Sequence, residues 1–255
     1  MARTKVLLLG ASGSIGASTL DVLRKHADRF ELVGVAAGRR VDPLLAAVAE
    51  FKPRVAALTD AEAARKAAKN LPPGTDWLLG DTQHMADMAR DLDYDVLLAA
   101  VTGAAGLPAV LEAARRGKRI ALANKESLVV TGPLLTSLCK QTGAELLPVD
   151  SEHSAIFQAQ QAGKREEIAR VVLTASGGAF PELSLDQLRQ VTVGDALAHP
   201  NWSMGPKITI DSATMMNKAL EIVECRWLFG LEPEKIDVVI HPQSVIHSMV
   251  EFVDG

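Results

Sequence analysis

The chain has only two cysteines and no long apolar run, and these scarcities exclude several kinds of protein. Cys139 and Cys225 lie far apart in segments expected to be helical, so we predict neither a disulfide framework nor a thiolate metal site. No stretch approaches the roughly eighteen apolar residues of a membrane span. The start, MARTKVLLLGASG, is typical of a first strand rather than a signal peptide. We expect a cytoplasmic protein that has no membrane partner.

A surplus of positive charge is also missing. The formal net charge is -4, and no run of Lys or Arg occurs, so electrostatics give no reason to expect a nucleic acid partner. What is present is ordinary for a globular protein: the 255 residues are 48% hydrophobic and 23% charged. That is enough to bury the core of one large domain or of two smaller ones.

Short apolar segments alternate with amphipathic ones through the first part of the chain. The predicted strands are KVLLLG, ELVGVAA, RVAAL, DVLLAA and RIALA, and helices are predicted from Ile15 to Lys25, from Asp42 and from Asp60. Continuously apolar strands that alternate with helices favour a parallel sheet covered on both faces. We predict an α/β, doubly wound, Rossmann-like domain over residues 1–149, followed by a second domain over residues 150–255.

The turn after the first strand reads GASGSIG, with Gly10, Gly13 and Gly16 three residues apart. Glycines there let the backbone approach a pyrophosphate, whose charge lies at the N-terminus of the next helix. The spacing is not GxGxxG, and a plain tight turn is the alternative. Its place after the first strand favours a dinucleotide.

The second strand runs into AAGRRVD, where an NAD enzyme would carry an acidic residue for the ribose hydroxyl. Arg39 and Arg40 stand there instead. Guanidinium groups suit a 2′-phosphate, so we predict NADP rather than NAD. The alternative is that these arginines are solvated loop charges.

The segment ALANKESLV carries Asn124, Lys125 and Glu126 at the end of the fifth predicted strand. Ligands of open α/β sheets bind at this edge. The alternative is a polar loop in which Glu126 starts a helix.

Two carboxylates follow the sixth predicted strand, ELLPV, in the segment PVDSEHSAIFQ. Asp150 and Glu152 are two residues apart, and in extended backbone such side chains point to one side. Oxygen ligands without cysteine favour Mg²⁺ or Mn²⁺. The alternative is a helix cap, since Asp or Ser followed by Glu is favoured in a first helical turn.

A third carboxylate occurs in DSATMMNKALEIVE, from Asp211 to Glu224. If this segment is helical, Asn217 and Glu221 are four residues apart and share a face, and Lys218 lies beside them. Together they could hold a phosphate ester and its metal. The alternative is a solvated surface pair between Lys218 and Glu221.

Two further segments could contact a ligand. Ser176 in TASGGAF can present a hydroxyl and backbone amides to an anion, or this can be a plain turn. HPNWSMGPK, from His199 to Lys207, is typical of a loop with an apolar tip. It either closes over a ligand or packs its Trp202 on the core.

These motifs, together with HPQSVIHSMV, stand in one order that closely resembles the 1-deoxy-D-xylulose 5-phosphate reductoisomerase family over essentially the whole chain. The resemblance implies an NADPH- and metal-dependent oxidoreductase. It would convert 1-deoxy-D-xylulose 5-phosphate to 2-C-methyl-D-erythritol 4-phosphate in non-mevalonate isoprenoid biosynthesis, by skeletal rearrangement and then hydride transfer. It also implies an α+β catalytic and dimerisation domain, and a homodimer.

The resemblance also implies roles for single residues. Metal ligands would be Asp150, Glu152 and Glu221. The residues that bind the sugar phosphate would be Ser151, Ser176, His199, Trp202, Ser212, Asn217 and Lys218. Lys125 would lie near the reacting atoms, and both Lys125 and His199 would be catalytic. The NADPH site would comprise Gly10, Ser12, Gly13, Ser14, Ile15, Gly38, Arg39, Arg40, Asn124, Glu126, Met204 and Gly205.

One departure and three rivals accompany this interpretation. The family continues past the final EFVDG, so we expect a chain cut inside a strand pair. A short-chain dehydrogenase would need Lys four residues after a Tyr, but the residue four positions after Tyr94 is Leu98. A semialdehyde dehydrogenase would need a loop cysteine. A non-catalytic form that binds NADPH and metal stays open.

Overall fold

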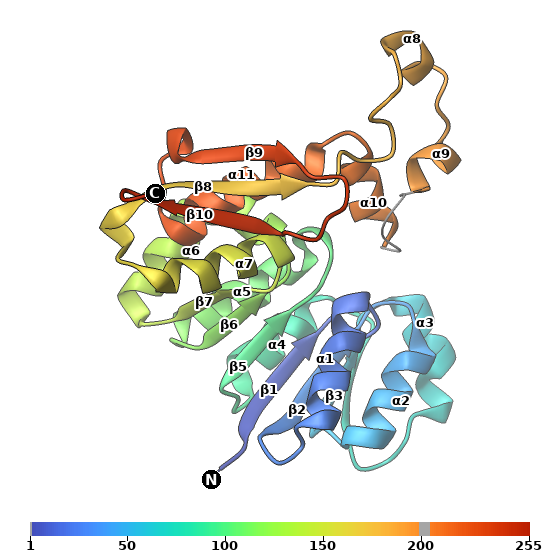
Figure 1. Cartoon of the computed structure of the whole chain (residues 1–255). Coiled ribbons are helices and arrows are strands. Elements are labelled where there is room, and N and C mark those ends of the chain that lie inside the picture. The colour runs from blue at the N-terminus through green and yellow to red at the C-terminus, as the bar shows by residue number, and fades with distance from the viewer. Residues whose placement is uncertain (1, 199–204) are drawn as a thin grey trace. The chain divides into compact units, whose positions relative to one another are not determined.

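The computed structural model describes residues 2–198 and 205–255. The chain forms two compact units, Met1–Leu147 and Pro148–Gly255, which divide two residues before the predicted boundary. Figure 1 shows the elements of each unit. Within the described residues, no helix is both long and apolar enough to cross a bilayer.

The first unit is built on a seven-stranded sheet of order β4-β3-β2-β1-β5-β6-β7. Its strands are β1 Thr4–Leu9, β2 Phe30–Ala37, β3 Val55–Leu58, β4 Asp76–Leu79, β5 Val96–Ala99, β6 Arg119–Leu122 and β7 Glu145–Pro148. Strands β1 to β6 pair in parallel. This confirms the predicted doubly wound fold. One strand, β4, was not predicted.

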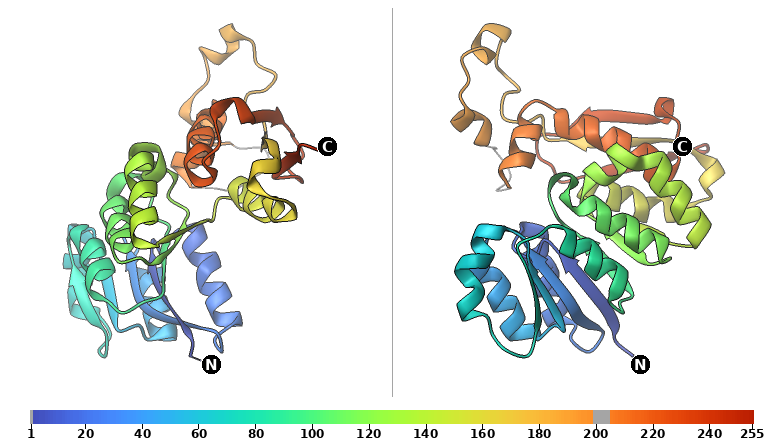
Figure 2. Two further views of the ribbon diagram at one scale, coloured as in Figure 1. Left: turned by 90° about the vertical axis from the view of Figure 1, so that its left-hand side faces the viewer. Right: turned by 180° about the vertical axis from the view of Figure 1, so that it is seen from behind.

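Helices cover both faces of this sheet. They are α1 Ser14–Lys25, α2 Val41–Phe51, α3 Ala61–Ala67, α4 Gln83–Asp91, α5 Leu107–Arg115 and α6 Lys125–Thr142. Helices α1 to α3 pack on β1 to β3 through Leu23, Leu44 and Ala64, whereas α4, α5 and α6 pack side by side. In Figure 2, α1 and the green helices lie on opposite faces.

The strand order reverses between β1 and β5, because the chain builds outward from β1 to β4 and then returns to β5. The carboxyl ends of these two strands flank the crevice in which open α/β sheets bind ligands. The turn at Gly10 lies there, as does the loop that joins β5 to α5.

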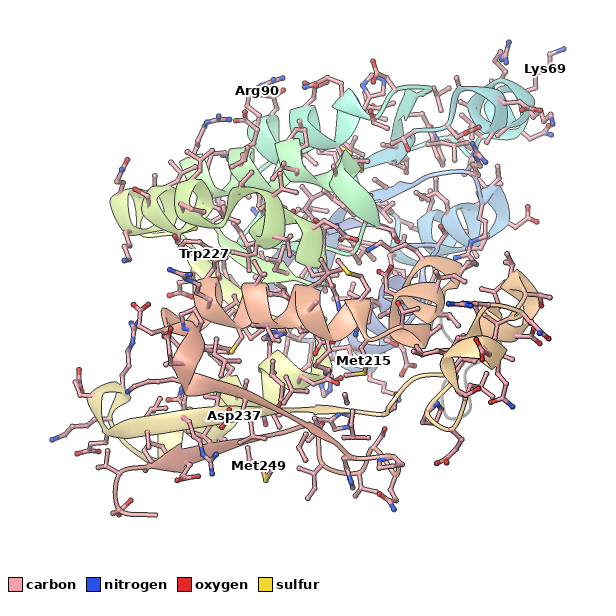
Figure 3. The ribbon with its side chains drawn as sticks, turned by 90° about the horizontal axis from the view of Figure 1, so that it is seen from above. Lys69, Arg90, Met215, Trp227, Asp237 and Met249 are labelled. Atoms are coloured by element: carbon pink, nitrogen blue, oxygen red, sulfur yellow. The ribbon has the colours of Figure 1, made fainter. Side chains whose placement is uncertain are left out.

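The second unit has a three-stranded sheet of order β10-β8-β9. Strand β8, Ile168–Ala175, pairs antiparallel with β10, Ser248–Phe252, and parallel with β9, Ile236–Ile240. Helices α7, Ser151–Ala159, and α11, Met216–Phe229, pack on one face through a core that includes Ile156, Val171 and Phe229. Figure 3 shows α11 running along the sheet, with Met215 and Trp227 marking its two ends.

Among the described residues between β8 and α11 there are three short helices: α8 Leu185–Leu188, α9 Val193–Leu197 and α10 Pro206–Ala213. The segment from Asp211 to Glu224 is therefore not one helix, although the part that carries Asn217 and Glu221 is helical, as the spacing argument requires. Met215 adopts a left-handed φ of 66° and separates α10 from α11. Ser212 lies on the first of these helices, while Asn217, Lys218 and Glu221 lie on the second.

Candidate functional site

The carboxylates predicted to bind metal converge in the second unit. Asp150, Glu152 and Glu221 each offer an oxygen within 4.8 Å of the others. Asp150 is the N-cap of α7 and accepts from the amide of Ser151 at 3.0 Å, and Glu152 lies in the first turn. The predicted reason, alternation along a strand, is wrong, because β7 ends at Pro148. A helix start brings these side chains together, so the cap and the carboxylate cluster are one feature.

Hydrogen-bond donors hold two of these carboxylates in place. Lys218 Nζ lies 3.2 Å from Glu152 Oε1 and also pairs with Glu221 Oε2, and Asn217 Nδ2 donates to Glu221 Oε1. Ser151 Oγ donates to Glu152 Oε2 at 2.6 Å. Lys218 is 5% exposed and Glu221 is 1% exposed. The alternative of a solvated surface pair is therefore excluded.

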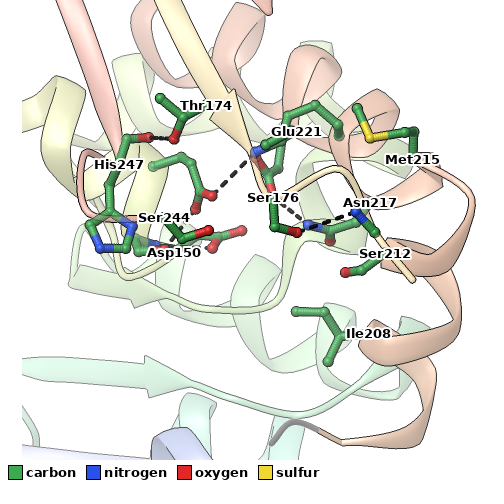
Figure 4. A pocket seen from close by; sticks show the side chains of 15 residues that line it. Asp150, Thr174, Ser176, Ile208, Ser212, Met215, Asn217, Glu221, Ser244 and His247 are labelled. Carbon is green, nitrogen blue, oxygen red and sulfur yellow. Dashed lines mark hydrogen bonds and ion pairs between the residues drawn. The ribbon is translucent and has the colours of Figure 1, made fainter. Parts of the chain in front are cut away.

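These groups line a cavity of about 260 Å³ in the second unit. Besides the carboxylates, it is lined by Ser151, Ser176, Ser212, Asn217 and Lys218, five of the seven residues expected at the sugar phosphate. Figure 4 shows Ser176, Ser212 and Asn217 close together, with Asp150 and Glu221 nearby. The other two, His199 and Trp202, lie outside the described residues, as does Met204. Gly205 is the exposed N-cap of α10.

The glycines of TASGGAF explain how Ser176 reaches Ser212. Gly177 and Gly178 have φ values of 93° and 79°, a region that only glycine adopts easily. A Cβ on Gly178 would lie 2.3 Å from the carbonyl oxygen of Ser212. The glycine therefore allows the turn after β8 to approach the end of α10, and two hydroxyls face the cavity beside one lysine.

Sequence reasoning gave no role to two cavity residues of HPQSVIHSMV, Ser244 and His247. The Nε2 atom of His241 accepts from the amides of Val245 and Ile246 at 3.1 and 3.2 Å, which folds this segment into a turn. Thr174 Oγ1 donates to the carbonyl of His247 at 2.8 Å. The pattern HPxSxIH was the available signal, because a histidine can accept from the amides that follow it.

Most residues of the predicted nucleotide site belong to the first unit. Gly10 has a φ of 95°, and a Cβ there would lie 2.3 Å from the carbonyl oxygen of Ala100, just after β5. Gly13 is the N-cap of α1 and provides no capping side chain. Main-chain amides therefore begin α1 beside the switch point, where they can hold a phosphate. Ser12 is half-buried, whereas Ser14 and Ile15 are exposed.

The arginines follow β2, as predicted. Arg39 Nε donates to Asp60 Oδ2 at 2.9 Å, while the Arg39 side chain stays 86% exposed. The amide of Ala63, and then Arg39, hold the pKa of Asp60 below its usual value. Arg40 is exposed, and a Cβ on Gly38 would meet nothing within 4 Å. Asp60 is a residue that sequence reasoning missed: it aims Arg39 while it caps α3.

The segment after β6 holds two parts of the first unit together. Asn124 is buried and caps α6 by accepting from the amide of Ser127, and its Nδ2 donates to the carbonyls of Val101 and Gly103 and to Glu126. This bonding ties the loop after β5 to α6. Lys125, the first residue of α6, is 7% exposed and is not among the cavity residues of the second unit.

The two cysteines lie on α6 and α11, as predicted. Both are buried and free, and burial raises the pKa of Cys139 to about 11 and that of Cys225 to about 12. Thiols protonated at neutral pH are poor nucleophiles. This agrees with the exclusion of a cysteine-dependent dehydrogenase.

Comparison with known proteins decides the family. The protein-family model described as 1-deoxy-D-xylulose 5-phosphate reductoisomerase matches residues 6–132. The protein-family model described as the C-terminal domain of the same enzyme matches residues 146–229. The chain belongs to the 1-deoxy-D-xylulose 5-phosphate reductoisomerase family. The family match confirms the resemblance drawn from the motifs.

Individual members of this family are similar along nearly the whole chain. The reductoisomerase of Chlorobium chlorochromatii is 51% identical over 248 residues, which cover 97% of this chain and 65% of the relative. A crystal structure of DOX-P reductoisomerase with NADPH, fosmidomycin and magnesium has a TM-score of 0.90 at 45% identity, covering 99% of this chain and 64% of that one. The Zymomonas mobilis enzyme with NADPH also scores 0.90, at 42% identity, covering 100% and 65%. The chain thus spans about two thirds of the length of these relatives.

Proposed function

We propose that this protein is an NADPH- and divalent-metal-dependent reductoisomerase that converts 1-deoxy-D-xylulose 5-phosphate to 2-C-methyl-D-erythritol 4-phosphate. The observation that carries this proposal is the cavity of the second unit. In it, Asp150, Glu152 and Glu221 lie beside Ser176, Ser212, Asn217 and Lys218. Relatives crystallised with NADPH, magnesium and fosmidomycin support the same assignment.

The carboxylate cluster fits a hard divalent cation. Its donors are oxygens on two different helices, α7 and α11, and such ligands favour Mg²⁺ or Mn²⁺. When bound, the metal supplies Lewis-acid stabilisation of negative charge on the substrate oxygens. Ser151 lies between two of the ligands in sequence, where its hydroxyl can contact the hydroxyl or carbonyl region of the substrate.

The remaining cavity groups suit a phosphate ester. Ser176 and Ser212 supply hydroxyls, Asn217 an amide, and Lys218 a positive charge, all of which donate to phosphate oxygens. Anchoring the phosphate fixes the distance between the far end of the substrate and the carboxylates. Orientation of this kind accounts for a large share of many enzymatic rate enhancements.

The nucleotide site of the first unit fits NADPH. The main-chain amides that begin α1 would hold the pyrophosphate, and Arg39, with Arg40 beside it, would hold the 2′-phosphate. NADPH, when bound, supplies the hydride. Asn124 would act by fixing the loop after β5, and Glu126, Lys125 and Gly205 keep the roles implied by the resemblance. His199, Trp202 and Met204 stay predictions for a closing loop.

The deciding experiment follows NADPH absorbance with the chain, 1-deoxy-D-xylulose 5-phosphate and Mg²⁺ or Mn²⁺, beside a chelator control. Metal-dependent oxidation is expected. If NADPH and metal bind but no oxidation occurs, the chain is instead a non-catalytic binding form of the family.

A homodimer is part of the proposal. Strands β9 and β10 are the edges of their sheet, and Val239, Ile240 and Met249 on these strands are each more than 40% exposed. Apolar edge strands favour pairing with another chain. Light scattering after gel filtration should give twice the 27.1 kDa chain mass; a monomer would contradict the assembly but not the activity.

A further inference from the structure

Two buried ionisable residues of the second unit have no role in the function proposed above. His153, on α7, is 0% exposed, and Glu224, on α11, is 1% exposed. His153 Nδ1 lies 3.4 Å from Glu224 Oε2. Burying two such groups is costly, and a buried pair is often replaceable by apolar residues without loss of stability. Stability is therefore a weak reason for their presence.

The contacts of His153 suggest another reason. Its Nε2 lies 3.0 Å from the main-chain carbonyl oxygen of Glu221, one of the three clustered carboxylate residues. A carbonyl only accepts, so Nε2 carries a hydrogen and Nδ1 is the atom that faces Glu224. The ring is also stacked on Phe229, at 6.2 Å between centroids and 25° between planes. The side chain of His153 on α7 thus contacts three residues of α11: Glu221, Glu224 and Phe229.

The carboxylates are divided between the same two helices. Asp150 and Glu152 belong to the start of α7, directly before His153, whereas Glu221 is on α11. Any slide or rotation of α11 against α7 would change the distance between the two sets of oxygens. The hydrogen bond from His153 holds the backbone of Glu221 itself. Glu224 Oε2 lies 3.4 Å from Nδ1, so a hydrogen shared between these two atoms would keep the ring in the orientation that this bond needs.

We propose that His153 and Glu224 are positioning residues that fix the spacing of the carboxylates on α7 and α11, and so raise the affinity for a divalent cation. This inference rests on the proposed metal site. Groups that orient metal ligands typically change metal affinity by about 10- to 100-fold when they are removed. The effect arises from geometry, so it does not require the charge of Glu224.

The test measures Mn²⁺ binding to the full chain, without substrate, from the electron paramagnetic resonance signal of free Mn²⁺, beside the thermal midpoint. The double variant His153→Leu with Glu224→Leu removes both buried polar groups and should fold, because apolar residues of similar size replace them. We expect Mn²⁺ to bind it at least about tenfold more weakly. Glu224→Gln keeps the size and can donate to Nδ1, so its affinity should stay within about threefold of wild type. Glu251→Gln, an exposed partner of Arg170, is the charge-matched control and should change nothing.

Each other outcome is decisive. Wild-type affinity in the double variant would mean that the pair is only structural, and would overturn the inference while the metal site stands. An equal loss in Glu224→Gln would mean that Glu224 acts through its charge, and would also overturn it. Absence of Mn²⁺ binding in the wild type would overturn the proposed function first, and the inference with it. If the double variant does not fold, Glu224→Met, which keeps the length, decides the same question.

Discussion

The ammonium of Lys218 lies 3.2 Å from one carboxylate oxygen of Glu152, on a different helix, and also pairs with Glu221 on its own helix. The side chain is 6% exposed, so little water screens these contacts. Lys218 therefore neutralises part of the charge that would otherwise repel within the carboxylate cluster. In the proposed function the same ammonium also binds the substrate phosphate. Lys218 would therefore have two separate roles, one toward the carboxylates and one toward the substrate.

Substituting Lys218→Met should separate these roles. Loss of a charged hydrogen bond of about 1.5–3 kcal/mol should raise the KM for the substrate by roughly 10- to 100-fold. Binding of Mn²⁺ should not weaken, because the carboxylates lose a competing cation. Isothermal titration with Mn²⁺ and steady-state kinetics measure the two effects. Lys207→Met, which removes an ammonium paired with Asp211 on α10, is the control. Weaker Mn²⁺ binding in Lys218→Met would show that the lysine supports the metal rather than competes with it.

Removing one carboxylate should abolish metal-dependent turnover while NADPH binding persists. Glu221→Gln keeps the shape of a side chain that is 1% exposed but removes an anionic ligand, and so does Glu152→Gln. Because the proposed contacts to the pyrophosphate and the 2′-phosphate come from residues of the first unit, the affinity for NADPH should change by less than about twofold, well under 1 kcal/mol. NADPH fluorescence titration measures the affinity for the cofactor, and the oxidation assay measures the metal-dependent turnover. Loss of NADPH binding in these variants would argue against this division of labour.

Arg39→Gln should reduce the preference for NADPH over NADH. A guanidinium that binds phosphate is worth about 1.5–3 kcal/mol, so the ratio of kcat/KM for the two cofactors should fall by roughly 10- to 100-fold. Asp60→Asn weakens the contact that aims Arg39 and should give a smaller change in the same direction. Arg54→Gln, in the same unit, is the control. An unchanged ratio in Arg39→Gln would mean that this arginine is only a solvated loop charge.

Much of the fold could be predicted because its signals are local. Apolar strands alternating with helices indicate a doubly wound sheet, and a glycine turn after the first strand indicates its nucleotide site. Strand β4 was missed because DWLL begins with a charged residue directly after the turn signal PPGT, so no continuous apolar run and no alternation marks it. The break between α10 and α11 was missed because Met215 adopts a left-handed conformation that methionine rarely takes.

Many residues of the candidate site could be predicted, although Ser244 and His247 were missed, but its geometry could not. Asp150 and Glu152 suited both a cap and a metal ligand, and the sequence could not show that one helix start serves both. The contact between His153 and Glu224 joins residues 71 positions apart, and no local pattern encodes such a pairing. Both residues look like ordinary helix positions until tertiary packing buries them.

The turn at Gly10 offers a test of the first unit that is independent of catalysis. Gly10→Ala would place a methyl 2.3 Å from the carbonyl oxygen of Ala100 at a φ of 95°. We expect a loss of about 1–3 kcal/mol from backbone strain, and weaker NADPH binding, because the turn must open where β1 meets β5. Gly38→Ala is the matched control for stability alone, because Gly38 is itself expected at the NADPH site. Its Cβ would meet nothing within 4 Å and its φ is not positive, so stability should be unchanged. Chemical denaturation followed by circular dichroism measures both variants. Equal stability in Gly10→Ala would mean that the turn can accept a methyl group despite the short distance to the carbonyl oxygen of Ala100. Close packing at the switch point would then not shape the nucleotide site.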